Sequence, residues 1–330
     1  MTKKLTGKKK TKSAVKPVTK PRTYVALILD KSGSMASTKT AAITGFNEQV
    51  QQLKEDAKTQ DILCSLVTFN GEVFEHLWNV PAEQLAEAAP EDFSPNGNTA
   101  MLDAVGYTVQ KLLSTTDHED PNAAYLIVVI SDGQTNMDKY YNWETLKELT
   151  QGCEASKKWT FTYMGCTKDY MEQLARNTGT PVSNMGAWSN RTTRGAAAGF
   201  ENLKARSKKY FTERSAGQLA ACNYSSDVSG MVADFESMPI TAAEAAPVLI
   251  DPADLPKVDF KSVLERQPKY ESQRSPSYNG GPLFANSMKV AWTNAAANDL
   301  AQNRMATVMP ANRTRSALRG SAVNNFLNKR

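Results

Sequence analysis

Five oxygen-bearing side chains stand where strand-like runs or loops of this sequence end, and their types suit metal binding. Asp30, Ser32 and Ser34 alternate in LDKSGSM, directly after a run of apolar residues. Thr99 precedes a helical pattern in SPNGNTAMLDAV, and Asp132 follows the most apolar run of the chain. Carboxylate and hydroxyl oxygens without His or Cys suit a hard divalent cation, Mg²⁺ first, although Mn²⁺ and Ca²⁺ accept the same ligands.

Each of these residues also has an ordinary structural interpretation. Asp30 and Ser34 are residue types favoured at the start of a helix, and Thr99 could cap the helix that follows it. Asp132 and the glycine after it could form no more than a turn. Three such groups at one edge of a sheet would favour a binding site over unrelated caps and turns, so the expected fold decides between the interpretations.

Other uses of the first motif fit less well. An EF-hand loop that starts at Asp30 would need an acidic residue at its twelfth position, which is Ala41. A nucleophile elbow would need glycine two residues before the serine, but Ser32 precedes Ser34 at that distance and Asp30 precedes Ser32. A hydrolase that uses the metal or Ser34 is disfavoured because no general base is positioned.

Short β-branched or aromatic runs alternate with segments of helical period from residue 23 onward. This alternation predicts an α/β fold with a doubly wound, mostly parallel central sheet. Asn70 and Gly71 between two strand-like runs predict a hairpin, which places one antiparallel strand at the sheet edge. The expected strands cover 23–30, 62–69, 72–78, 123–132 (the central one), 159–165 and about 182–188, and the expected helices cover about 37–57, 99–113, 143–157, 168–177 and 193–212.

This fold would bring the oxygen-bearing residues together. In an open α/β sheet, ligands bind outside the carboxyl ends of the strands, where several loops converge. Asp30 and Asp132 fall at such ends, and Thr99 precedes a helix at the same edge. Asp103, one helical turn after Thr99, could support the site, or it could only cap its helix or face solvent. Residues 96–98 should shape the second loop.

These motifs resemble a known family. DKSGS is similar to the DxSxS element of the von Willebrand factor type A (VWA) domain, and Thr99 and Asp132 fall where that family has its second-loop threonine and third-loop aspartate. The resemblance covers residues 23 to about 212 and implies a metal-ion-dependent adhesion site (MIDAS). It implies that Ser32, Ser34 and Thr99 bind the metal through their hydroxyls, and that Asp30 and Asp132 contact it largely through water.

The resemblance also implies a function. A cation with few directly bound carboxylates still attracts an anionic ligand, so an Asp or Glu of a partner protein can complete its coordination. We therefore expect a non-enzymatic, metal-dependent protein–protein interaction module of the intracellular or viral type. The family context suggests an AAA+ ATPase or the subunits of an assembly as partners. The alternative is a structural or accessory component of a larger, possibly viral, assembly anchored by its tails.

The two ends of the chain differ from its middle. Residues 1–22 carry eight Lys and one Arg, so the net charge of +5 leaves 30 basic against 34 acidic residues elsewhere. We expect this arm to be disordered, with contact to nucleic acid as the alternative. Residues 213–330 are expected to form a low-complexity, largely extended or disordered tail, although Val248–Ile250, Phe260, Leu264 and Trp292 could dock on the domain or bind a partner.

The remaining composition points to a reducing compartment. Cys64, Cys153, Cys166 and Cys222 have no CxxC spacing, which favours reduced core cysteines over a disulfide framework or a zinc site. A basic start without an apolar h-region does not predict a signal peptide, and no run is long enough to cross a membrane. We expect a cytoplasmic protein, or a virion component, without membrane contact. His76 and His118 are expected to be structural or exposed.

Overall fold

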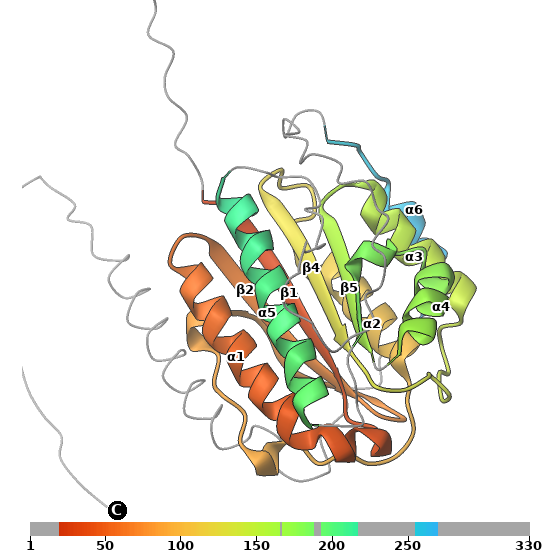
Figure 1. Ribbon diagram of the computed structural model, residues 1–330. Coiled ribbons are helices and arrows are strands. Elements are labelled where there is room, and N and C mark those ends of the chain that lie inside the picture. The colour runs from red at the N-terminus through yellow and green to blue at the C-terminus, as the bar shows by residue number, and fades with distance from the viewer. Residues whose placement is uncertain (1–19, 166, 188–192, 217–254, 270–330) are drawn as a thin grey trace, which may run out of the picture. The chain divides into compact units, whose positions relative to one another are not determined.

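A computed structural model describes residues 20–165, 167–187, 193–216 and 255–269. Figure 1 shows a central sheet with helices on both faces. The elements are, in chain order, β1 (Arg22–Asp30), the 3₁₀ helix η1 (Gly33–Thr38), α1 (Lys39–Ala57), β2 (Asp61–Phe69), β3 (Val73–Pro81), η2 (Ala82–Gln84), η3 (Pro90–Asp92), α2 (Met101–Thr115), β4 (Ala123–Ile130), α3 (Trp143–Ala155), β5 (Trp159–Gly165), α4 (Lys168–Thr178), η4 (Val182–Asn184), β6 (Met185–Ala187), α5 (Thr193–Ser215) and α6 (Phe260–Glu265).

The sheet has six strands in the order β3-β2-β1-β4-β5-β6. All neighbouring strands are parallel except β2 and β3, which form the antiparallel hairpin at one edge. The predicted doubly wound sheet with one antiparallel edge strand is therefore confirmed. Every residue of β4 is buried, because the strand lies inside the sheet and both of its faces are covered.

Two apolar layers hold the sheet between the helices. Alternate residues of β1 face opposite sides, so Leu27 packs in the layer beneath α1 and α5, whereas Ile28 packs in the layer beneath α2, α3 and α4. Helices α1 and α5 approach closely at Gly45, where a Cβ would lie 1.9 Å from the Phe200 ring. This contact explains a glycine inside α1, since any side chain there would displace Phe200.

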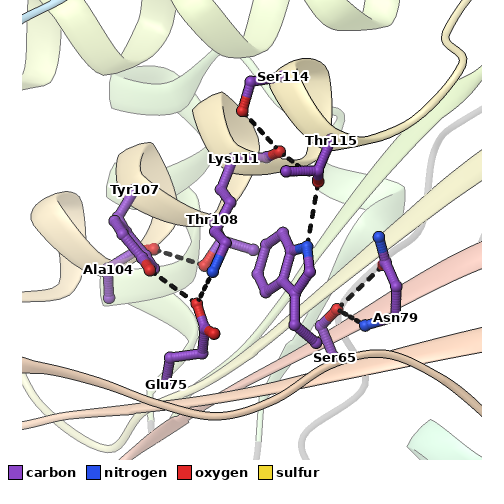
Figure 2. A network of polar contacts seen from close by, with 10 residues as sticks. Ser65, Glu75, Asn79, Ala104, Tyr107, Thr108, Lys111, Ser114 and Thr115 are labelled. Carbon is purple, nitrogen blue, oxygen red and sulfur yellow. Dashed lines mark hydrogen bonds and ion pairs between the residues drawn. The ribbon is translucent and has the colours of Figure 1, made fainter. Parts of the chain in front are cut away.

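The edge strand β3 is fastened to α2 by a polar network (Figure 2). The Glu75 carboxylate accepts a hydrogen bond from the Tyr107 hydroxyl at 2.7 Å and forms an ion pair with Lys111. The Trp78 indole nitrogen donates to the Thr115 hydroxyl at 3.0 Å. These contacts join the inner part of β3 to the C-terminal half of α2, so they hold the hairpin against the domain.

Most of the tail predictions fall on residues that the structure does not describe, namely 1–19, 217–254 and 270–330. Within the described residues, α5 continues to Ser215, and the short helix α6 packs against α3. Phe260 is buried there, and Leu264 is partly buried. Cys64 and Cys153 are buried and form no disulfide, whereas Cys166 and Cys222 lie outside the described residues. No helix in the described ranges has the length and apolar character needed to span a bilayer.

Candidate metal centre

Two of the three loops at the candidate site leave the sheet side by side. The first loop, residues 31–38, follows β1, and the third loop, residues 131–142, follows β4. β1 and β4 are parallel neighbours, with Leu29 opposite Ile130, so their carboxyl ends lie at the same edge. Side chains at the starts of these loops therefore lie close together at this edge of the sheet.

The second loop, residues 93–100, is tied to the first by the main chain. Gly33 N donates to Gly97 O at 3.0 Å, and Asn96 N donates to Lys31 O at 2.8 Å. Gly97 has a φ of +76°, in the left-handed region that glycine adopts without strain. A side chain at this position would strain the turn that presents the Gly97 carbonyl to Gly33.

We call the edge of the sheet where the loops 31–38, 93–100 and 131–142 meet the rim. Asp30 lies at this rim and is fully buried. One carboxylate oxygen accepts the Ser32 amide at 2.7 Å, and the other accepts the Ser131 hydroxyl at 2.5 Å. Burial raises the pKa of Asp30 to about 6, although the hydrogen bonds from Ser131 and Ser32 act in the opposite direction. The rim thus holds a negative charge whose burial is compensated only in part by these donors.

Ser32, Ser34 and Asp132 continue the cluster. The Ser32 and Ser34 hydroxyl oxygens are 3.1 Å apart, and the Ser34 hydroxyl donates to Asp132 Oδ1 at 2.7 Å. Ser32 and Asp132 are buried, whereas Ser34 is exposed. Burial also raises the pKa of Asp132, against the hydrogen bond from Ser34. The exposed position of Ser34 marks the side from which solvent reaches the cluster.

Thr99 joins this arrangement through its main chain. Its amide donates to Asn136 Oδ1 at 3.0 Å, and its carbonyl accepts the amides of Asn136 and Met137 at 2.8 and 3.0 Å. Thr99 is buried between the loops. The structure therefore links Asp30, Ser32, Ser34 and Asp132 by hydrogen bonds, and it fixes the main chain of Thr99 to the third loop, which also carries Asp132.

Asp103 organises the third loop from α2. Its carboxylate accepts the main-chain amides of Lys139, Tyr140 and Tyr141 at 2.7, 3.0 and 2.8 Å. Asp138 accepts the Asp103 amide at 3.1 Å in return. Of the roles considered for Asp103, support of the site describes these contacts, because its carboxylate accepts amides of a loop 36 to 38 residues later in the sequence.

The helix-start interpretation holds in part. Ser34 lies in the first turn of η1, whose N-cap is Ser32, although the Ser32 side chain makes no capping hydrogen bond. The residue that caps α1 is Thr38, and the one that caps α2 is Ala100, so Thr99 does not cap its helix. Tyr141 of the third loop is buried. Sequence reasoning missed Ser131, the hydroxyl donor to Asp30. The adjacency of β1 and β4 could have revealed it, since Ser131 follows the central strand directly.

The sequence model for the von Willebrand factor type A domain matches residues 25–191, which is half of the chain. The chain belongs to the VWA domain family. Domains of this family are generally protein-interaction modules. No curated protein matches the chain significantly.

Solved VWA structures resemble the chain at low identity. A von Willebrand factor type A protein from Catenulispora acidiphila is 17% identical with a TM-score of 0.39, over 57% of this chain and 43% of that one. The vWF domain of the type V pili tip protein Mfa5 from Porphyromonas gingivalis is 13% identical with a TM-score of 0.41, over 57% of this chain and 95% of that one. The manganese-loaded TRAP protein of Plasmodium vivax is 17% identical with a TM-score of 0.38, over 55% and 72%.

The donor set of this VWA domain fits a hard divalent cation. The rim combines two carboxylates whose pKa values are raised by burial with serine hydroxyls that are already hydrogen bonded to one another. Such oxygens match Mg²⁺, Mn²⁺ or Ca²⁺ better than softer metals. In the part of the chain that the structure describes, no group of three or more His, Cys, Asp or Glu side chains is arranged to hold a metal. Any cation at this rim would therefore depend on hydroxyl and water ligands.

Proposed function

We propose that this VWA domain binds a divalent cation, Mg²⁺ first, at the rim and uses it to hold an acidic side chain of a partner protein. Ser32, Ser34 and Thr99 would supply hydroxyl oxygens, and Asp30 and Asp132 would act largely through water. The bound cation would supply positive charge for a partner carboxylate. The observation that carries this proposal is the hydrogen-bonded run from Asp30 through Ser32 and Ser34 to Asp132.

The charge balance supports a binding role. Two carboxylates can at most neutralise a divalent cation, and their contact through water would leave it attractive to a further anion. Ser34, the exposed member of the cluster, would lie beside the incoming carboxylate. We propose that an Asp or Glu of the partner protein approaches the cation beside Ser34. The family context suggests partners in multi-protein assemblies.

A binding role is proposed over catalysis. The Ser34 hydroxyl donates to a carboxylate and not to a histidine. His76 shares a hydrogen bond of 2.8 Å with the Thr68 hydroxyl, and burial lowers its pKa to about 4. A histidine with so low a pKa stays neutral near pH 7 and is a weak base. Turnover of an ester or phosphoester that disappears in Ser34→Ala would contradict this part of the proposal.

The test compares Ser34→Ala with Ser37→Ala in the full chain. Both serines are exposed residues of η1, but the Ser37 hydroxyl points to the Ser34 carbonyl at 3.4 Å and not to the cluster. We expect Mg²⁺ affinity, measured by calorimetry, to fall about 10-fold or more in Ser34→Ala and to stay unchanged in Ser37→Ala. Partner capture should likewise need Mg²⁺ and be lost in EDTA. Capture that survives both EDTA and Ser34→Ala would overturn the proposal.

A further inference from the structure

A short segment distant from the rim, residues 255–269, rests on α2 and α3. Its helix α6 has six residues and buries two apolar side chains, Phe260 and Val263. Val263 packs over Gly152 of α3, where a Cβ would lie 3.2 Å from a Val263 methyl group. The Phe260 ring meets the His118 imidazole edge-on, with centroids 4.9 Å apart. The surface thus fits a short helix with apolar residues three positions apart.

One side-chain amide connects this segment to both α2 and the third loop. Gln110 Nε2, on α2, donates to the Pro268 carbonyl at 3.0 Å and to the Tyr141 hydroxyl at 2.6 Å. A carbonyl can only accept, so the amide nitrogen must face Pro268. The two hydrogens of one NH₂ group therefore serve the docked segment and the third rim loop at once.

Tyr141 connects Gln110 with the third loop of the rim. Its ring packs so closely on α2 that a Cβ at Gly106 would lie 2.1 Å from it. Its amide donates to Asp103, which also accepts the amides of Lys139 and Tyr140. Movement of the Tyr141 ring would consequently disturb the three hydrogen bonds that shape the end of the third loop, which begins with Ser131 and Asp132.

The docked segment makes few contacts, and one of its buried groups opposes docking. The segment buries two apolar side chains fully, and its ion pair between Arg266 and Glu148 is exposed. Gln267 is 5% exposed, yet neither polar atom of its side chain has a hydrogen-bond partner among the described residues. Burial of the Gln267 amide without hydrogen bonds opposes docking, because water would satisfy this amide once the segment leaves the surface.

We infer that residues 255–269 are a docking segment that binds reversibly to the surface of α2 and α3. When bound, the segment holds the third rim loop through Gln110 and Tyr141. The connection to the loop stands on the contacts above. Its consequence for metal binding rests on the proposed function.

The test measures hydrogen exchange of the full chain in EDTA, so that failure of the metal proposal does not affect it. Phe260→Ala/Val263→Ala removes the anchors of the segment, and Gln110→Ala removes the connecting amide from a helix that tolerates alanine. Lys261→Ala changes an exposed residue of the same short helix and is the matched control. We expect the amides of residues 139–141 to exchange about 3- to 10-fold faster in both test variants and at the wild-type rate in Lys261→Ala.

Two results would overturn the inference. In the wild type, exchange of residues 260–265 at the rate of an unstructured peptide would show that the segment does not dock. Faster exchange in the segment and α3 of Phe260→Ala/Val263→Ala, with residues 139–141 unchanged, would show docking without connection to the rim. If Mg²⁺ binds, a parallel calorimetric titration should show weaker affinity in both test variants.

Discussion

Two carboxylates of this domain are held in different ways. Glu75, at the edge of the sheet, forms an ion pair with Lys111, and the Lys111 ammonium lies 4.5 Å from the centroid of the Trp78 ring. Asp30, at the rim, accepts hydrogen bonds from the uncharged Ser32 amide and Ser131 hydroxyl. The first network contains its own positive charge, whereas the hydrogen bonds to Asp30 contribute only dipoles.

The difference separates a structural role at Glu75 from the binding role that we propose for Asp30. A paired carboxylate contributes by fastening one element to another, here β3 to α2. A buried carboxylate with dipoles alone keeps much of its charge uncompensated, which explains why the pKa of Asp30 is raised to about 6. An added cation would relieve that cost at the rim but has no comparable effect at Glu75.

The largest effect should come from Asp30→Asn. The amide keeps the shape and can still accept the Ser32 amide, but it removes the charge. We expect Mg²⁺ affinity to fall about 100-fold, measured by calorimetry, because a residue at the centre of the proposed site loses its charge. We expect Mg²⁺ to raise the melting temperature of the wild type and not that of Asp30→Asn. Equal Mg²⁺ affinity in Asp30→Asn and wild type would remove the distinction between the two carboxylates.

An effect of intermediate size is expected at Glu154, where the cost of burying a carboxylate can be measured without metal binding. This α3 residue lies away from the rim loops, and burial raises its pKa to about 7, with Lys157 opposing the shift. Its folded pKa exceeds the ordinary value of 4.5, so the folded state binds the proton more tightly. The cost of ionising it is absent below about pH 4.5, grows as the pH rises to 7, and is complete above pH 7.

Glu154→Gln should therefore stabilise the folded state by about 2 kcal/mol at pH 8, after allowance for its partial exposure, and by little at pH 4.5. Urea unfolding at the two pH values measures the difference, with the exposed Glu83→Gln as control. Mg²⁺ should not change the effect. A gain of the same size at both pH values would mean that the charge of Glu154 is not its source.

Glu75→Gln should give the smallest effect, a loss of about 1 kcal/mol in the free energy of unfolding. The Lys111 side chain is 26% exposed, so its ammonium can still reach water after the pair is broken. Chemical denaturation, with the exposed Glu72→Gln as control, measures the loss, and the Mg²⁺ response should remain that of the wild type. A change in Mg²⁺ response without a change in stability would reverse the roles assigned to the two carboxylates.

Local patterns were sufficient to predict most of the sheet and helices. The strand over residues 159–165 agrees with β5 at both ends, and the Asn70–Gly71 hairpin joins β2 to β3 as expected. These elements depend on the period of apolar residues and on turn types, which are visible in neighbouring residues. The helix α6 was not predicted, because six residues are too few to show a helical period and the segment is helical where it packs on α3.

The candidate site also combines contacts between near neighbours in the sequence with contacts between distant loops. The contact of Asp30 with the Ser32 amide joins residues two positions apart and could be anticipated from DKSGS. Local sequence patterns did not assign Ser131 as the donor to Asp30, or Asp103 as the acceptor of three third-loop amides. Both depend on which loops the sheet and α2 place side by side.

The sequence by itself determined the strand and helix periods, the alternation of oxygen-bearing residues after the first strand, and the membership of the VWA family. Only the tertiary structure decided that the Ser34 hydroxyl meets Asp132, 98 residues later, and that residues 255–269 contact the same helix that supports the third loop. The physical reason is the separation of the residues along the chain. Backbone periodicity relates residues that are only a few positions apart. The contacts named here join residues far apart in the sequence, and they follow from the parallel register of β1 with β4 and from close packing between layers.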